Sequence, residues 1–236
     1  MKKQRLDKYI STQLNLPRAM SKTQIHRGKV RVGDTVVSDP SYLFDPEADE
    51  VFYKGEKVNY SEHVYIVMNK PKGVLCATED KNQKTVLDIL PQEFLRKNIF
   101  PVGRLDKDTT GLLILTDDGQ FAHKCIAPSK TVGKTYSVVL DGELSPDLVD
   151  LFKNGITLAD DTVCKPAKLE IIDKNVAELT ITEGKYHQIK RMFGTVGLGV
   201  VELKRIKIGL FDLPENLQEG ECRMLSESEK LDLLAT

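Results

Sequence analysis

The chain has 236 residues, which is enough for one large domain or two modest ones with a hydrophobic core. Hydrophobic residues make up 40% and charged residues 29%, as in ordinary globular proteins, and no apolar run is long enough to cross a bilayer. The first residues lack the apolar segment of a secretory signal and the four cysteines form no C-x-x-C pair, so we expect a cytoplasmic protein with neither a zinc site nor a disulfide framework.

The net charge of −1 hides an uneven distribution along the chain. Residues 1–31 carry nine Lys or Arg and one acid, whereas residues 32–60 carry seven acids and two Lys. Residues 184–207 again carry six Lys or Arg against one acid. Because local fields decide how strongly phosphate is attracted, the two basic segments are candidate nucleic-acid contacts. The alternative is that they are ordinary solvated helix faces.

The first third of the chain predicts a small module of two helices followed by strands. One helical face carries the apolar residues Leu6, Tyr9, Ile10 and Leu14. Pro17 suits the first turn of a second helix, which Gly28 can end. Residues 30–37 predict two short strands around a Gly-Asp turn, and residues 51–53 predict a third strand.

The rest of the chain alternates strand-like and helix-like segments after a linker expected at residues 54–63. Strands are expected at residues 64–68, 112–115, 136–140 and 176–182. A helix is expected between Ser145 and Gly155, and Ser226 with Glu229 has capping-box spacing for a last short helix. This irregular order favours an α+β fold with a mixed or antiparallel sheet.

The segment from Gly103 to Gly119, GRLDKDTTGLLILTDDG, carries the first candidate site residue. Asp106 lies between two glycines, two residues after Arg104 and just before an apolar run of strand length, which suits an active-site acid. One alternative is a turn or capping aspartate. Another is a divalent-metal site formed with Asp108, Asp117 and Asp118, although Arg104 and Lys107 already compensate the local charge.

Two further segments carry candidate residues. In residues 183–193, EGKYHQIKRMF, an apolar helical stripe is formed by Ile189, Met192, Phe193 and Val196. Lys190 falls at the border of this stripe, from which its ammonium can reach a partly buried carboxylate, whereas Arg191 projects toward solvent or RNA. His187 lies away from the stripe, as an RNA-facing or hydrogen-bonding residue. Tyr136 opens a strand, where a Tyr is usually a packing residue but can also be an aromatic platform.

Together these segments resemble the RsuA-type pseudouridine synthases. The GRLD segment is similar to their GRLDxxTTGLLxxTxDG signature, Lys134-Thr135-Tyr136 to their KTY element, and residues 187–192 to their HQ[IV][KR]RM motif. Asn69-Lys70-Pro71-Lys72-Gly73 is similar to their first motif, a structural support for the active-site loop. Residues 1–60 look like an S4 RNA-binding domain, and residues 61–236 are then the catalytic domain, with flanking helices and a central cleft.

The resemblance implies an enzyme that isomerises a uridine in RNA, and it gives the residues their roles. Asp106 would act at the ribose, Lys190 would pair with it, and Tyr136 would stack on the extruded base. Other implied RNA contacts are Arg104, Ile189, Arg191 and His187 in the catalytic domain, and Arg5, Arg18, Lys22, Arg27 and Lys29 in the S4 domain. The reaction needs no metal, nucleotide or redox cofactor, and the chain has no P-loop or G-x-G-x-x-G segment.

The implied substrate is one uridine of 16S rRNA, position 516 in the reference rRNA numbering, within an assembling small ribosomal subunit. Because no heptad or long exposed apolar stripe is visible, a monomer without membrane association is expected. Three alternatives remain open at this point. They are a 23S rRNA synthase of the same family, a non-catalytic S4-containing assembly factor, and a metal-dependent phosphoesterase built on the acidic residues.

Overall fold

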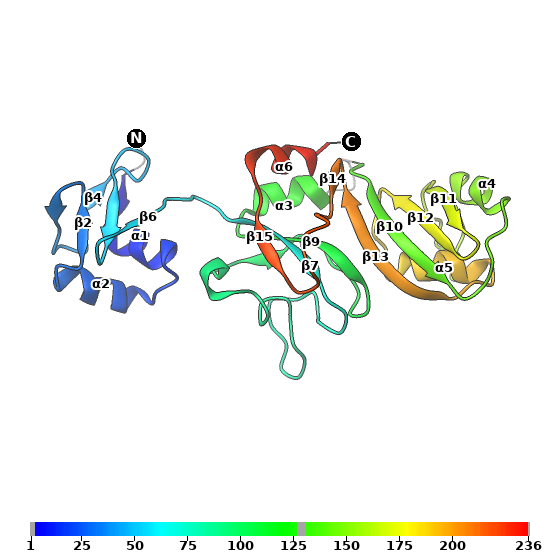
Figure 1. Cartoon of the computed structure of the whole chain (residues 1–236), viewed down its shortest axis with the longest axis horizontal. Coiled ribbons are helices and arrows are strands. Elements are labelled where there is room, and N and C mark those ends of the chain that lie inside the picture. The colour runs from blue at the N-terminus through cyan, green and yellow to red at the C-terminus, as the bar shows by residue number, and fades with distance from the viewer. Residues whose placement is uncertain (1–2, 127–130, 236) are drawn as a thin grey trace. The chain divides into compact units, whose positions relative to one another are not determined.

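The computed structural model describes residues 3–126 and 131–235 (Figure 1). The chain divides into two compact units, of which the first comprises Met1–Val64 with Pro91–Ile99 and the second Tyr65–Leu90 with Phe100–Thr236. The expectation of a linker over residues 54–63 is wrong for residues 56–58. Glu56–Val58 is a strand, β6, because Lys54 and Gly55 adopt positive φ angles and turn the chain back onto the preceding strand.

The first unit packs two helices against a four-stranded antiparallel sheet. The helices are α1 (Leu6–Gln13) and α2 (Arg18–His26), and Pro17 lies directly before α2 as expected. The sheet has the order β3-β2-β5-β6, with β2 at Val30–Val32, β3 at Thr35–Val36 and β5 at Val51–Tyr53. A separate two-stranded ladder joins β1 (Gln4–Arg5) to β4 (Leu43–Phe44). The predicted helices, hairpin and third strand are therefore confirmed.

A single core holds this unit together. Alternate strand residues and one face of each helix meet in it, and its members include Leu6, Tyr9, Ile10, Ile25, Val30, Phe44, Val51 and Val58. The Tyr9 hydroxyl, buried among them, donates to the Val58 carbonyl at 2.9 Å, so its polar end is satisfied. The remaining expected helix residue, Leu14, packs against the same core from the end of α1.

The second unit is built on a nine-stranded sheet. Its main order is β11-β12-β10-β13-β9-β7-β15, with β14 on β13 and β8 on β9. The strands are β7 (Tyr65–Lys70), β8 (Phe100–Pro101), β9 (Thr110–Thr116), β10 (Lys134–Leu140), β11 (Lys168–Asp173), β12 (Val176–Ile181), β13 (Val200–Ile208), β14 (Phe211–Asp212) and β15 (Cys222–Met224). Among the described residues its ladders are antiparallel except β13 with β9, so the expected α+β fold with a mixed, mainly antiparallel sheet is confirmed.

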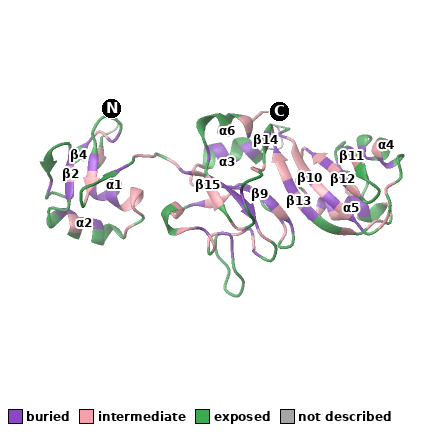
Figure 2. Cartoon of the chain, in the orientation of Figure 1, coloured by how far each residue is buried: buried purple, intermediate pink, exposed green. Residues whose placement is uncertain are grey.

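Four helices pack on this sheet. They are α3 (Gly119–Ile126), α4 (Leu148–Lys153), α5 (Gln188–Thr195) and α6 (Glu227–Asp232). Figure 2 shows buried residues along β9, and α3 joins β7 and β9 in one core through Phe121, Ala122 and Cys125. The expected capping box of α6 is present at Ser226 and Glu229. No helix within the described residues is long and apolar enough to cross a membrane.

The junction of β9 with β13 explains one glycine of the GRLD segment. Gly111 has φ +98°, and a Cβ there would lie 2.2 Å from the carbonyl oxygen of Arg205. The two parallel strands can approach this closely only if position 111 has no side chain. Because Asp106 lies five residues earlier, this close approach fixes where the loop that carries Asp106 leaves the sheet.

Candidate active site

Asp106 lies in the loop that leads into β9. Its carbonyl oxygen accepts a hydrogen bond from the Thr109 amide at 3.1 Å, so residues 106–109 form a turn. The side chain is 29% exposed, which leaves the carboxylate accessible but partly desolvated. Such a position suits an acid that must act on a bound molecule.

Lys70, the last residue of β7, stabilises this loop through hydrogen bonds from its buried ammonium group. Its side chain is completely buried, and its ammonium donates to the carbonyls of Pro71, Lys107 and Thr109 at 3.1, 3.2 and 2.9 Å. The Gly73 amide also donates to the Lys107 carbonyl, at 2.8 Å. Burial lowers the pKa of Lys70. The first motif thus ties the ends of β7 and β9 together through one ammonium group, which agrees with the supporting role that the resemblance implies.

Lys190 of α5 is shared between two carboxylates. Its ammonium lies 2.7 Å from both carboxylate oxygens of Asp108 and 3.7 Å from Oδ2 of Asp106. The hydrogen bonds from Lys190 lower the pKa of Asp108, against the opposing effect of its partial burial. The pairing expected between Lys190 and Asp106 is therefore present as the longer of two contacts, and Asp108 is the primary partner.

His187 completes the surroundings of Asp106, from a position that differs from the one expected. It was expected on the helix, but α5 begins at Gln188, and His187 precedes it with φ 47° in the left-handed region. This bend directs the imidazole toward the loop, where Nε2 lies 3.6 Å from Oδ1 of Asp106. A histidine and a lysine from one helix N-terminal turn thus contact the two oxygens of one carboxylate.

The two arginines expected to meet RNA have different surroundings. Arg104 is exposed, as expected. Arg191 is only partly so, because its Nη2 contacts Oδ1 of Asp160 at 2.5 Å and its Nη1 donates to the Tyr186 carbonyl at 3.3 Å. An RNA contact through Arg191 remains a prediction, and it would have to compete with the Asp160 carboxylate.

Tyr136 lies on β10, which β13 separates from β9. It is 7% exposed, and the guanidinium carbon of Arg205 lies 6.0 Å from the centre of its ring. Arg205 is itself buried, and its Nε donates to the Leu112 carbonyl at 2.8 Å, whereas its buried Nη2 has no hydrogen-bond partner among the described residues. Ile189, the other expected base contact, is buried in the first turn of α5.

The acidic residues do not gather into one metal site. Asp117 and Asp118 follow the far end of β9, whose seven residues span about 23 Å, so they are far from Asp106 and Asp108. Asp118 accepts hydrogen bonds from the Tyr65 hydroxyl and from amides at the start of α3. Within the described residues no three His, Cys, Asp or Glu side chains are placed to hold a metal ion. The hypothesis that Asp106, Asp108, Asp117 and Asp118 form one metal site is therefore wrong.

In the first unit, two of the expected RNA contacts surround a buried acid. Arg5 and Arg18 each donate twice to the carboxylate of Asp7, at 3.1 to 3.3 Å, and Asp7 is completely buried. Burial opposes ionisation of Asp7, but the two guanidinium groups outweigh it and lower its pKa to about 2. The arginine side chains remain about half exposed, so both can still meet a phosphate.

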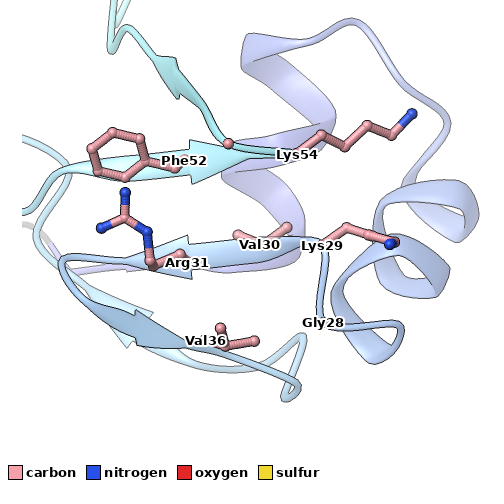
Figure 3. A pocket seen from close by; sticks show the side chains of 8 residues that line it. Gly28, Lys29, Val30, Arg31, Val36, Phe52 and Lys54 are labelled. Carbon is pink, nitrogen blue, oxygen red and sulfur yellow. The ribbon is translucent and has the colours of Figure 1, made fainter.

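The other expected contacts of the first unit, Lys22, Arg27 and Lys29, are exposed. Lys29 also lines a shallow groove at the end of the sheet, which Figure 3 shows together with Lys54. In this groove the guanidinium of Arg31 lies over the ring of Phe52, 3.7 Å from its centre. The first unit therefore exposes several cations on and after α2, as a phosphate-binding surface requires.

Three residues of the second unit have a place that the sequence reasoning did not assign. The sequence indicates Asp108 only as a candidate metal ligand and Lys70 only as part of a supporting motif, and it does not single out Arg205. A signal for Arg205 exists, because it follows the buried Leu203 by two residues in a strand and must share its face. No comparable signal pairs Asp108 with Lys190, which is 82 positions away.

Two family profiles match the chain. The profile described as RNA pseudouridylate synthase matches residues 64–195, and the S4 domain profile matches residues 4–51. The first covers more than half of the chain. It includes the loop of Asp106, Tyr136 and the whole of α5. The second covers α1, α2 and the strands β2 to β4.

Individual proteins are similar along nearly the whole chain. An RNA pseudouridine synthase of Bacillus subtilis, named YtzG and described as uncharacterized, is 44% identical, covering 95% of this chain and 96% of that protein. The ribosomal small subunit pseudouridine synthase A of Escherichia coli K12 is 39% identical, covering 95% and 97%. A crystal structure of a pseudouridylate synthase superposes with a TM-score of 0.69 at 38% identity, covering 97% of this chain and 99% of that one.

Proposed function

This chain belongs to the RNA pseudouridylate synthase family and carries an N-terminal S4 domain, and on that basis we propose that it isomerises one uridine of 16S rRNA with Asp106 as its catalytic aspartate. The observation that carries the role of Asp106 is the contact of its two carboxylate oxygens with His187 and Lys190, on a loop held by a buried ammonium. The Escherichia coli relative, a ribosomal small subunit pseudouridine synthase, and the S4 domain support this choice of target RNA.

The reaction rearranges bonds without oxidation or reduction. The bond between C1′ of the ribose and N1 of uracil breaks, and a bond between C1′ and C5 forms. The C5 proton is lost and N1 ends protonated, so the product is an isomer of the substrate. Asp106 either attacks C1′ or removes the 2′ proton. Since no electron or group is supplied from outside, we propose that the enzyme uses no metal and no organic cofactor.

The surroundings of Asp106 suit either route, because both need a carboxylate oxygen that can reach the ribose. The ammonium of Lys190 lies 3.7 Å from Oδ2 of Asp106. Lys190 is held in place by its two short contacts with Asp108, so its ammonium does not form an equally short ion pair with Asp106. Asp106 therefore keeps lone pairs available for the sugar, which a tight bidentate ion pair would occupy.

The remaining roles are proposed from position. A uridine must leave its stack to reach Asp106, and an aromatic surface compensates the lost stacking. Tyr136, with Arg205 next to its ring, would supply that surface, and Ile189 would back the base. The exposed Arg104, two residues before Asp106, would bind a phosphate of the flipped nucleotide. The central cleft that would receive the base remains a prediction.

The S4 domain would add affinity without reading the sequence. Arg5, Arg18, Lys22, Arg27 and Lys29 would contact phosphates. We propose that the substrate is 16S rRNA in an assembling small subunit, where the S4 domain and the catalytic domain of one monomer bind neighbouring parts of the same RNA.

The test maps pseudouridine in unmodified 16S rRNA, free or bound to small-subunit proteins, by carbodiimide labelling and primer extension. The wild-type chain should give one new stop, expected at position 516. Asp106→Asn should give none while its circular dichroism is unchanged, and Asp150→Asn, an exposed acid of α4, should match wild type. Product from Asp106→Asn would remove Asp106 from the mechanism. If the same mapping gave a stop in 23S rRNA and none in 16S rRNA, the proposed target would be wrong. No stop in either RNA would refute the proposed activity.

A further inference from the structure

Tyr186 is unusually exposed for an aromatic side chain next to an active site. It is 76% exposed, although its neighbour His187 contacts the carboxylate of Asp106. Leaving a large aromatic ring in water forgoes the free energy of burying it. This exposed ring, one residue from a contact of Asp106, is therefore available to stack on a bound molecule.

The ring of Tyr186 is held in one orientation by its neighbour. It stacks on the imidazole of His187 with 3.9 Å between ring centres and 20° between ring planes. His187 covers one face of the Tyr186 ring, and the exposure of the side chain leaves the opposite face open to a planar ligand. Since Nε2 of the same imidazole lies 3.6 Å from Oδ1 of Asp106, only one imidazole ring separates the Tyr186 ring from the carboxylate.

The backbone around Tyr186 is braced. Arg191 donates to its carbonyl at 3.3 Å. On the other side, the Lys185 amide donates to Oε1 of Gln188 at 2.9 Å, and Nε2 of Gln188 donates to Glu183 at 2.8 Å. The left-handed conformation of His187 adds a fixed bend directly after Tyr186. The Tyr186 ring is thus preorganised before binding, which reduces the conformational entropy lost when a ligand stacks on it.

We propose that Tyr186 is the stacking platform for the base next to the target uridine in the RNA strand. This inference rests on the proposed function, because it needs the target uridine at Asp106. When that uridine is flipped out, the adjacent base loses one stacking neighbour. Tyr186 replaces that neighbour, stacking on the base with the ring face that His187 leaves open. Stacking tolerates any base, so Tyr186 contributes affinity and register rather than base identity.

The test compares Tyr186→Leu, Tyr186→Phe and the wild-type chain in single-turnover reactions with excess protein over a 16S rRNA substrate. Tyr186→Leu should raise the half-saturating protein concentration roughly 5- to 100-fold, with a limiting rate within about three-fold of wild type. Tyr186→Phe keeps the ring and should stay within about two-fold. Leu231→Ala, which shortens another exposed apolar side chain in the same unit, is the matched control and should behave as wild type.

A second measurement identifies the base. 2-Aminopurine is placed on either side of the target uridine, and its fluorescence in the saturated complex should be quenched on one side by the wild-type chain but not by Tyr186→Leu. An unchanged half-saturating concentration, a loss confined to the limiting rate, or equal fluorescence at both positions would overturn the proposal. The last two would mean that Tyr186 supports His187 or contacts something else. Absence of product from the wild-type chain would instead refute the proposed function.

Discussion

At the scale of single residues, the position of Lys190 between Asp106 and Asp108 carries the electrostatics of the site. One ammonium faces two carboxylates, so the three groups together hold one more negative than positive charge. Asp108 is 55% exposed and can share its charge with water, whereas Asp106 is 29% exposed. Lys190 therefore contacts both acids, and its shorter contacts are with the more exposed Asp108.

Replacing Lys190 tests this account. Lys190→Met removes the cation and leaves two carboxylates facing each other, so the limiting rate of pseudouridine formation should fall on the order of 10²-fold. The pKa of Asp108 should rise, because the hydrogen bonds that lower it are lost. Lys190→Arg retains the charge and should lose less than about 10-fold. Single-turnover rates measure both, with Lys153→Met on the exposed end of α4 as control. Full activity of Lys190→Met would contradict the account.

At the scale of elements, buried polar groups join segments that the chain brings together. Lys70 connects the end of β7 with the loop before β9 through three carbonyls. Asp7 does the same for the helices of the first unit, because Arg5 precedes α1 and Arg18 begins α2. In both cases one fully buried charge is compensated by several hydrogen bonds, which is the condition under which a buried charge is tolerated.

The Asp7 junction makes the first unit sensitive to acid. Its pKa of about 2 lies below the ordinary value of 3.8, so its contribution to stability is complete above about pH 4 and is lost as the pH falls toward 2. Allowing for the half-exposed arginines, the loss should be about 1–2 kcal/mol. Urea unfolding followed at amide signals of the first unit should show it for the wild-type chain but not for Asp7→Asn. Equal pH dependence in both chains would contradict the prediction.

At the scale of the whole molecule, the charge is segregated rather than large. The net charge is −1, yet residues 1–31 carry nine cations and residues 184–207 carry six. The first segment contains α1 and α2 of the S4 domain, and the second contains α5 and most of β13. The acids of residues 32–60 lower the total charge, so attraction to phosphate depends on the local basic segments and not on the net charge.

This arrangement predicts how RNA binding depends on salt. Changing Lys22, Arg27 and Lys29 together to Gln should weaken binding at least about 10-fold and lower the slope of log Kd against log salt by about 2 to 3. The limiting rate should stay unchanged, because Asp106 and its neighbours are intact. Filter binding at several salt concentrations measures the slope. The control changes Lys153, Lys168 and Lys174, three exposed lysines of the second unit, and a slope change of the same size there would contradict the prediction.

Long apolar or capped segments of the fold could be predicted from the sequence. β7, β9, β10 and β12 follow apolar or alternating runs, and the capping box of α6 is a local signal. Short strands such as β1, β4, β8 and β14 were not predicted, since two residues become a strand only through their partners. β6 lies in the expected linker, because the positive φ angles of Lys54 and Gly55 make a hairpin turn that the sequence pattern does not indicate.

The α+β class, the family and the candidate acid, lysine and tyrosine can be predicted from the amino-acid sequence, because they depend on local patterns and ordered motifs. Which of these groups contact one another depends on the folded structure. It placed Asp108 rather than Asp106 closest to Lys190, bent His187 toward the loop, and put Arg205 beside Tyr136. These contacts join residues far apart in the chain, and their distances depend on strand order and on the close approach of β9 and β13, which no local pattern encodes.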